Sequence, residues 1–297
     1  MREAEQGFLL LTCPLGDPER GMLTTAQFRT LAKRAMQMEK PLDNRDMSKE
    51  DLIALGYGAD FAERILALLS QTDLLEHYLH RSRLAGCQCI SRIHENYPVK
   101  LRNSLGLDSS GSLWAKGDLS LLQQPMIALV GSRELRNENA YFARQIGIEA
   151  AQQGYVLVSG NARGADRTAQ DACLEAGGKV ISVLADELEK YPVRENLLYL
   201  SENGFDLPFT TQRALSRNRV IHALAQKTFV AQVTDGRGGT WDGTVKNLRF
   251  GWSPVFCYQD GTAGSGNLIQ MGATPVEISD LQNLSILTSN TISFFDQ

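Results

Sequence analysis

The stretch that decides the fold is residues 127–166, IALVGSRELRNENAYFARQIGIEAAQQGYVLVSGNARGAD. It holds two short apolar runs, residues 127–130 and 155–158, and each run breaks at glycine and small polar residues. Apolar residues at helical spacing lie between the runs, and a second helical pattern begins at Asp166. The order β-α-β-α predicts a parallel sheet with a ligand crevice at the carboxyl ends of its strands.

The two turns that follow these strands carry the groups of an anion site. Each turn has a glycine, which lets backbone N–H groups approach a phosphate, together with a serine hydroxyl and an arginine that can form forked hydrogen bonds. These residues are Gly131, Ser132 and Arg133 in the first turn and Ser159, Gly160 and Arg163 in the second. The alternative is a pair of ordinary turns with arginines in solvent. Two such turns in one unit favour the phosphate site.

Composition places the chain among globular proteins with room for two domains. It has 297 residues, of which 43% are hydrophobic and 22% are charged. The early apolar run at residues 8–13 is too short for a signal sequence or a membrane span, so we expect a cytoplasmic protein without a membrane partner.

Cysteine, histidine and charge restrict the chemistry further. Five cysteines and four histidines occur without metal-ligand spacing, so free thiols are expected, with neither a metal site nor another cofactor. The net charge of −4 argues against a diffuse basic surface. Any nucleic-acid site must be a local concentration of arginines.

We expect an α/β fold, an extended Rossmann-like doubly wound and mostly parallel sheet with a small helical N-terminal domain. The expected divisions are a helical domain at 1–82, a connector and lead-in at 83–125, a Rossmann-like domain at 126–276 and a C-terminal tail at 277–297. Further strands are expected at 179–185, 228–233 and 254–258, and a helix is expected at 197–204.

The N-terminal region contains one motif, LGYGADFAERI at residues 55–65. It is similar to a helix-hairpin-helix, in which the amides of a turn containing Gly56 and Gly58 hold a DNA phosphate without reading sequence. A plain corner between two helices, capped by glycines, is the alternative.

Five segments together resemble the DNA-processing protein A (DprA/Smf) family in order and spacing. They are residues 127–133 (IALVGSR), 159–166 (SGNARGAD), 179–192 (KVISVLADELEKYP), 217–221 (RNRVI) and 264–273 (GSGNLIQMGA). The resemblance implies an extended Rossmann-like domain that binds single-stranded DNA without sequence preference. It also implies a homodimer that loads a RecA-type recombinase during DNA uptake, and a protein with no catalytic residues, which is not an enzyme.

Carried over by this resemblance, three motifs would line a phosphate-holding pocket. Their residues are Gly131, Ser132 and Arg133; Ser159, Gly160, Arg163, Gly164 and Asp166; and Arg217, Asn218 and Arg219. Arg217 and Arg219 cannot share one helical face, so one of them would reach DNA while the other holds a loop. Asp166 would orient Arg163 or cap a helix rather than act as a catalyst.

Three loop aromatics, Tyr191, Phe209 and Trp241, would stack on bases or lie buried.

The chain departs from the family pattern after the strand expected at 228–233. Residues 238–244, GGTWDGT, replace a serine-rich turn and resemble the phosphate-binding signature of nucleotide phosphoribohydrolases. Gly239, Thr240 and Thr244 would then contact phosphate. Those enzymes need a glutamate where this chain has Asn247, and a neutral amide cannot act as general acid or base. We therefore expect phosphate binding without hydrolysis. A pocket for a small nucleotide, or a protein-interaction module with a vestigial pocket, are the alternatives.

Overall fold

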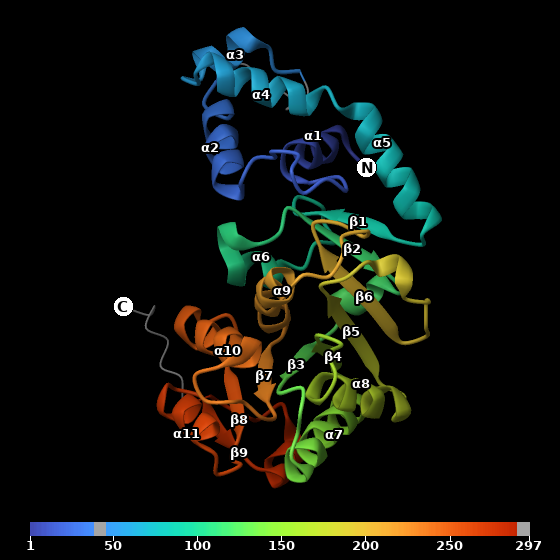
Figure 1. Cartoon of the computed structure of the whole chain (residues 1–297), viewed down its shortest axis with the longest axis vertical. Helices are drawn as coiled ribbons and strands as arrows, with labels where there is room; N and C mark the ends of the chain where they lie inside the picture. Colours follow the sequence, from blue (N-terminus) through green and yellow to red (C-terminus); the bar gives the residue numbers. More distant parts are fainter. Residues whose placement is uncertain (39–45, 290–297) are drawn as a thin grey trace.

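The computed structural model describes residues 1–38 and 46–289, and it is built around one nine-stranded sheet (Figure 1). The strand order is β1-β2-β6-β5-β4-β3-β7-β8-β9. Strands β3 to β9 pair in parallel, while β1 and β2 add an antiparallel edge. The chain winds outward from β3 in one direction and then returns to β7 on its other side, so the predicted doubly wound α/β fold is confirmed.

The strands are short and almost wholly buried. They are β1 (Gln88–Ser91), β2 (Ser112–Lys116), β3 (Met126–Val130), β4 (Val156–Ser159), β5 (Lys179–Leu184), β6 (Leu197–Glu202), β7 (Lys227–Val230), β8 (Val255–Tyr258) and β9 (Thr274–Val276).

Alternate residues of each central strand enter different cores. Ile127 and Leu129 face one core, while Ala128 and Val130 face the other, as the two-residue repeat of a strand requires. Helices cover both faces, which explains why these strands read as unbroken apolar runs.

On one face lie α7 (Asn137–Gln152) and α8 (Ala165–Glu175). On the other lie α6 (Val99–Leu105), α9 (Thr211–Leu224), α10 (Gly238–Phe250) and α11 (Ala263–Gln270). Short 3-10 turns occur at Gly106–Asp108 (η1), Leu119–Gln123 (η2), Leu188–Lys190 (η3) and Ile278–Asn283 (η4).

The N-terminal helices form a separate layer at one end of the molecule (Figure 1). They are α1 (Glu3–Thr12), α2 (Thr25–Ala35), α3 (Lys49–Ala54), α4 (Ala59–Leu69) and α5 (Thr72–Leu84). Part of their contact with the sheet is an aromatic cluster. Tyr78 of α5 packs edge-on against Trp114 of β2 and lies 5.0 Å from the Phe205 ring, measured between centroids. The Tyr78 hydroxyl also donates a 2.5 Å hydrogen bond to Asp206.

Two expectations need correction. Residues 83–125 are more than a connector, because β1 and β2 lie within them and pair into the sheet through β6. The helix expected at 197–204 is wrong, because residues 197–202 form β6. All six residues of β6 are buried between β5 and β2, and a short apolar run of this kind has no periodicity that distinguishes strand from helix.

The C-terminal segment packs back on the sheet domain. Gln153, just after α7, donates to the Leu281 carbonyl at 2.8 Å and accepts from the Leu284 amide at 2.7 Å. The described part of the expected tail is therefore held against α7, and residues 290–297 lie outside the described residues. In residues 1–38 and 46–289, no helix has the length and apolar character needed to cross a bilayer.

Candidate functional site

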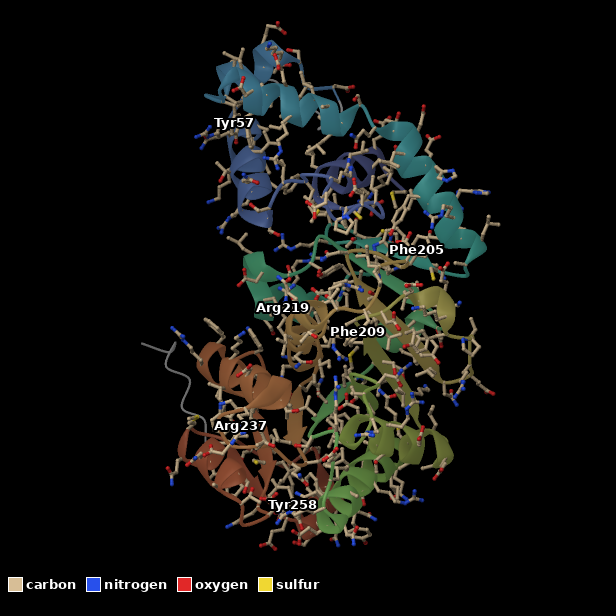
Figure 2. All side chains as sticks on the ribbon, viewed as in Figure 1. Tyr57, Phe205, Phe209, Arg219, Arg237 and Tyr258 are labelled. Atoms are coloured by element: carbon tan, nitrogen blue, oxygen red, sulfur yellow. The ribbon has the colours of Figure 1, made fainter. Side chains whose placement is uncertain are left out.

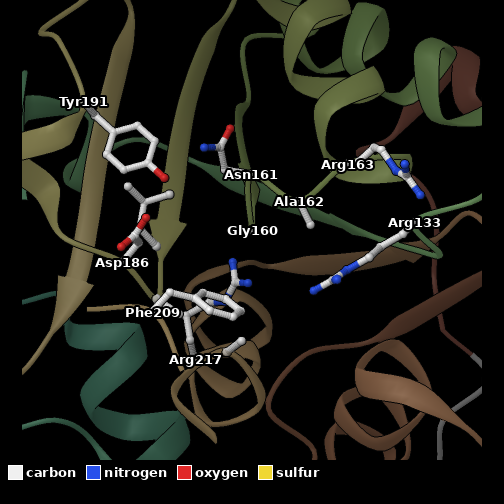
Figure 3. Close-up of a pocket in the computed structure, with 12 residues that line it drawn as sticks. Arg133, Gly160, Asn161, Ala162, Arg163, Asp186, Tyr191, Phe209 and Arg217 are labelled. Carbon is white, nitrogen blue, oxygen red and sulfur yellow. The ribbon is translucent and has the colours of Figure 1, made fainter. Parts of the chain in front are cut away.

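A cleft of about 1010 Å³ opens at the carboxyl ends of β3 and β7, where the strand order reverses. Its walls are the loops after β3, β4 and β7, one side of α9 from Thr211 to His222, and the start of α10. A smaller pocket of about 290 Å³ continues from it beside β5, where Arg133, Arg163, Arg217, Phe209 and Tyr191 surround one space (Figure 3).

Positive charge is concentrated in this cleft. Five arginines and two carboxylates line it, although the whole chain has a net charge of −4. The arginines are Arg133, Arg136, Arg163, Arg217 and Arg237, and the carboxylates are Glu134 and Asp166. A local excess of positive charge attracts anions, and an anion-binding site in a chain of net negative charge needs such an excess.

The arginines differ in how free they are. The exposed side chains of Arg133 and Arg237 have no hydrogen-bond or ion-pair partner within the described ranges 1–38 and 46–289. Arg163 forms a 3.3 Å ion pair with Glu134, and both side chains are exposed. Arg136 is held at 2.8 Å by Asp260, whose side chain is fully buried. Arg133, Arg237 and Arg163 are therefore the groups that can turn to a ligand.

The backbone amides of the turn after β4 are already hydrogen-bonded to a side chain of the protein. The amides of Gly160 and Ala162 donate to the Asp166 carboxylate at 3.1 and 3.2 Å. A Cβ on Gly160 would overlap both Asp166 and Arg217, so glycine is required here for packing. The expectation that the Gly160 amide is free to bind phosphate is therefore wrong. Asp166 orients the backbone of this turn and not the side chain of Arg163. Burial raises the pKa of the Asp166 carboxyl and lowers that of the Arg217 guanidinium, while attraction between the two groups opposes both shifts.

The other glycines of the motifs also serve packing. A Cβ on Gly131 would come within 2.5 Å of the Ala165 Cβ at the start of α8. Gly164 has φ +86° and lies against the carbonyls of Ser132 and Arg133, so it holds the first two loops together. Ser132 lines the cleft, although its amide and hydroxyl both donate to Gln232. Ser159 is fully buried and does not line the cleft, contrary to expectation.

The two arginines of the α9 motif take different roles. Arg217 lines the cleft but is only 8% exposed, and it donates to the Val183 carbonyl. Arg219 points away from the cleft, donating to Asp108 of η1 and pairing with Glu202 of β6 at 2.7 Å. The expectation that Arg219 lines the pocket is corrected, and its role is to hold α9 against its neighbours. Asn218 lines the cleft and donates to the Gly239 carbonyl at 2.9 Å.

The glycine-rich segment after β7 is the start of a helix, because α10 begins at Gly238. Gly239 and Thr240 line the cleft, and the Thr240 hydroxyl donates to the Gly131 carbonyl at 2.9 Å. Phosphate contact at these two residues stays a prediction. Thr244 lies further along α10 and is fully buried, so the expected phosphate contact at Thr244 is wrong.

Asn247 belongs to a buried polar network beneath α10. Its Oδ1 accepts from the Ser253 amide at 2.9 Å, and its Nδ2 lies 3.1 Å from His222 Nδ1. Burial lowers the pKa of His222 to about 3, so this ring is neutral at physiological pH. Asn247 therefore stabilises the end of α10 and does not face the cleft.

Sequence reasoning missed two arginines and could not choose among the aromatics. Arg136 and Arg237 line the cleft, and the Gly-Arg-Gly-Gly pattern at 236–239 was the signal for Arg237. Phe209 is 53% exposed and lines both the cleft and the smaller pocket, whereas Trp241 packs partly buried on the core.

The N-terminal motif joins α3 and α4 through a short turn, a form shared by a helix-hairpin-helix and by a plain corner between two helices. Gly56, with φ +83°, turns the chain between α3 and α4, and Gly58 is the N-cap of α4. Arg34 of α2 donates to the Leu55 carbonyl at 3.1 Å and lies over the Tyr57 ring. Helices α3 and α4 lie at the end of the long axis farthest from α10 and α11 (Figure 1), so this motif cannot share a phosphate with the cleft. DNA contact at Gly56 and Gly58 remains a prediction.

Within residues 1–38 and 46–289, no group of three or more histidine, cysteine or acidic side chains is arranged to hold a metal ion.

Comparisons with known proteins agree with this architecture. The family model described as DNA recombination-mediator protein A matches residues 88–285. DNA processing protein DprA of Streptococcus pneumoniae is 31% identical over 179 residues, which are 56% of this chain and 63% of that protein. DprA of Bacillus subtilis is 29% identical over 175 residues, which are 55% of this chain and 58% of that protein. The matched region thus spans less than two thirds of either relative.

Solved structures show the same fold. The X-ray structure of S. pneumoniae DprA superposes with a TM-score of 0.70 at 24% identity, covering 93% of this chain and 95% of that one. A structure of DprA from Helicobacter pylori, described for its single-stranded DNA binding mode, superposes with a TM-score of 0.57 at 24% identity. It covers 66% of this chain and 94% of that one. Because the family model matches two thirds of the chain, from β1 to the end of η4, the chain belongs to the DNA recombination-mediator protein A family.

Proposed function

We propose that this protein binds single-stranded DNA through its phosphates, without preference for base sequence, in the arginine-lined cleft. The observation that carries the proposal is a pair of arginines at one cleft, Arg133 and Arg237, on the loops after β3 and β7. Neither side chain has a partner among the residues that the structure describes. Arginine binds phosphate through forked, charge-assisted hydrogen bonds that carry no base information. The binding mode described for the H. pylori relative supports the same ligand.

The apolar wall of the cleft favours a single strand over a duplex. Phe209, Ala214 and Leu215 line it opposite the arginine loops, and Phe209 is half exposed. An exposed aromatic ring can stack on an unpaired base of any type, whereas the bases of a duplex are already stacked. The phosphates would then face the loops after β3, β4 and β7, and the bases would face α9.

A binding titration with salt tests this proposal. Fluorescence anisotropy of a labelled mixed-sequence oligonucleotide should show affinity that falls with salt, with a slope of about −0.7 per phosphate contacted. Unlabelled single strands of other sequences should compete equally, and duplex DNA should compete poorly. A flat salt response, or strong preference for one sequence, would contradict the proposal.

A small-nucleotide ligand is the second candidate. The pocket of about 290 Å³ beside β5 favours it, because the pocket is small and Asn161, Asp186 and Tyr191 line it next to the arginines. Displacement of the oligonucleotide by a nucleoside monophosphate at comparable concentration would select this candidate. We propose binding without hydrolysis, because Asn247 is a buried amide. Release of free base from a nucleoside monophosphate would overturn that part.

The wider role is proposed from family membership. We propose that the protein acts in the cytoplasm as a homodimer, and that its DNA complex assists loading of a RecA-type recombinase during DNA uptake, recombination or defence. Light scattering of the free protein tests the dimer. A strand-exchange assay, with and without the protein, tests recombinase loading on DNA that is already coated by a single-strand-binding protein.

Glu134 should weaken DNA binding in the natural sequence. Its carboxylate lies at the cleft and pairs with Arg163 at 3.3 Å, so it competes with phosphate for that arginine. Replacing Glu134 by Gln should tighten binding about two- to fivefold at low salt, within the range measured for exposed ion pairs. The gain should shrink as salt is raised. The control is Glu175→Gln, which removes an exposed carboxylate paired with Arg144 on α7 and α8. Weaker binding by Glu134→Gln would contradict this role.

A further inference from the structure

Helix α10 carries an exposed stripe that begins at the cleft. Gly238 lines the cleft, and Asp242 and Lys246 follow at four-residue spacing, so all three lie on one face of the helix. The next turn of this face carries Arg249 and Phe250, which are also exposed. The stripe therefore connects the cleft to the carboxyl end of α10, about 20 Å away along a helix of this length.

At that end three planar groups are stacked. The Arg249 guanidinium carbon lies 5.4 Å from the centroid of the Phe250 ring. Phe250 in turn stacks on Trp252, with ring centroids 5.7 Å apart and an interplanar angle of 17°. Phe250 remains 51% exposed and Arg249 is also exposed, so the stack is presented to solvent.

The stack is held in place by the residues around it. Gly251 adopts a left-handed conformation, with φ 65° and ψ 34°, which turns the chain at the end of α10. The Trp252 carbonyl accepts hydrogen bonds from Lys100 at 3.0 Å and Ser104 at 3.3 Å, both on α6. The next residue, Ser253, is bonded through its amide to Asn247 at 2.9 Å. These bonds hold the backbone at Trp252 and Ser253, at the base of the stack, to both α6 and α10.

We propose that the stack of Arg249, Phe250 and Trp252 is a second contact for the single strand, where a base that has left the cleft stacks on the Arg249 guanidinium. The proposal rests on the function proposed above. The basic side chains of Arg237, at the edge of the cleft, and of Lys246 and Arg249, on the stripe, outnumber the acidic Asp242. This excess of positive charge suits a phosphate backbone. Bases stack on guanidinium planes as well as on aromatic rings, and exposed stacking of this kind tolerates any base.

The geometry limits which DNA can reach both contacts. At the 3.4 Å spacing of charges along one strand, 20 Å corresponds to about six nucleotides, and fewer if the strand is extended. An oligonucleotide of about four nucleotides should therefore occupy the cleft alone, whereas one of about sixteen should reach the stack as well. A protein partner at this apolar and basic face is the competing occupant, and it predicts no effect of oligonucleotide length.

The test compares both lengths on three variants of the full chain. For Arg249→Ala and Phe250→Ala, we expect affinity for the long oligonucleotide to fall about tenfold, the order expected for one stacked base. Affinity for the short one should not change. Arg249→Lys keeps the charge but removes the plane, so it should lose most of the same affinity. The matched control is Tyr141→Ala on α7, because Tyr141 is 52% exposed and lies on the opposite face of the sheet.

The results for the two oligonucleotides separate the second contact from binding in the cleft. Equal affinity of Phe250→Ala and the natural sequence for the long oligonucleotide would overturn the second contact, even if the cleft still binds DNA. Full retention by Arg249→Lys would reduce the site to a charge contact and overturn stacking. Arg249→Lys leaves the packing of the Phe250 ring on Trp252 in place, so the test survives if Phe250→Ala folds poorly. If neither oligonucleotide binds, the function proposed for the cleft is refuted instead.

Discussion

The double variant Arg133→Ala/Arg237→Ala should lose single-stranded DNA affinity by roughly a hundredfold or more at low salt, since a hydrogen bond to a charged group contributes about 1.5–3 kcal/mol. Both guanidiniums line the cleft and are without partners in the described part of the chain, so neither loss is offset by a freed internal group. If each arginine contacts one phosphate, the salt slope should become shallower by about 1.4. Anisotropy titrations at several salt concentrations measure both quantities.

A matched double variant separates this effect from net charge. Arg83→Ala/Arg144→Ala removes the same charge from exposed positions on α5 and α7, outside the cleft. It should change affinity by less than about threefold, because exposed charges separated by more than a Debye length are screened. Equal losses in the two double variants would show that net charge, and not the cleft, governs binding.

Replacing Trp114 by Ala should destabilise the protein by about 3–5 kcal/mol, the usual cost of removing a large aromatic side chain from a core. Trp114 is fully buried in β2, where its ring packs against Tyr78 and lies 5.5 Å from Phe205 between centroids. The change opens a cavity between the N-terminal helices and the sheet. Urea unfolding measures the loss, and unfolding in two steps would show that the helices separate first.

The corresponding control is Trp241→Ala, which removes a partly buried ring from α10 and should cost less. Trp114 does not line the cleft, so folded Trp114→Ala protein should bind single-stranded DNA with its normal affinity. A loss below about 1 kcal/mol would mean that the aromatic cluster does not hold the two layers together.

The sequence by itself was sufficient for the central unit of the fold. The apolar runs that became β3, β4, β5, β7 and β8 were recognised, because each is short and a helical pattern separates it from the next run. Glycine or proline also flanks β3, β4, β5 and β8. The position of the cleft also followed, since a doubly wound sheet places its ligand crevice at the carboxyl ends of its strands.

Strand β6 and the antiparallel edge required the tertiary structure. Residues 197–202 form a strand because β5 and β2 are available to pair on both sides, and nothing local in six buried residues shows this. The same reasoning explains β1 and β2, which pair with each other across the twenty residues that separate Ser91 from Ser112.

The roles of the site residues divide in the same way. Spacing in the sequence identified which turns meet at the cleft, including those of Arg133, Arg163 and Gly239. It could not show that Asp166 occupies the amides of the β4 turn, or that Arg219 turns away to Glu202. A motif specifies which groups are present, whereas competition among neighbouring charges and hydrogen-bond donors in three dimensions decides which of them remain free for a ligand.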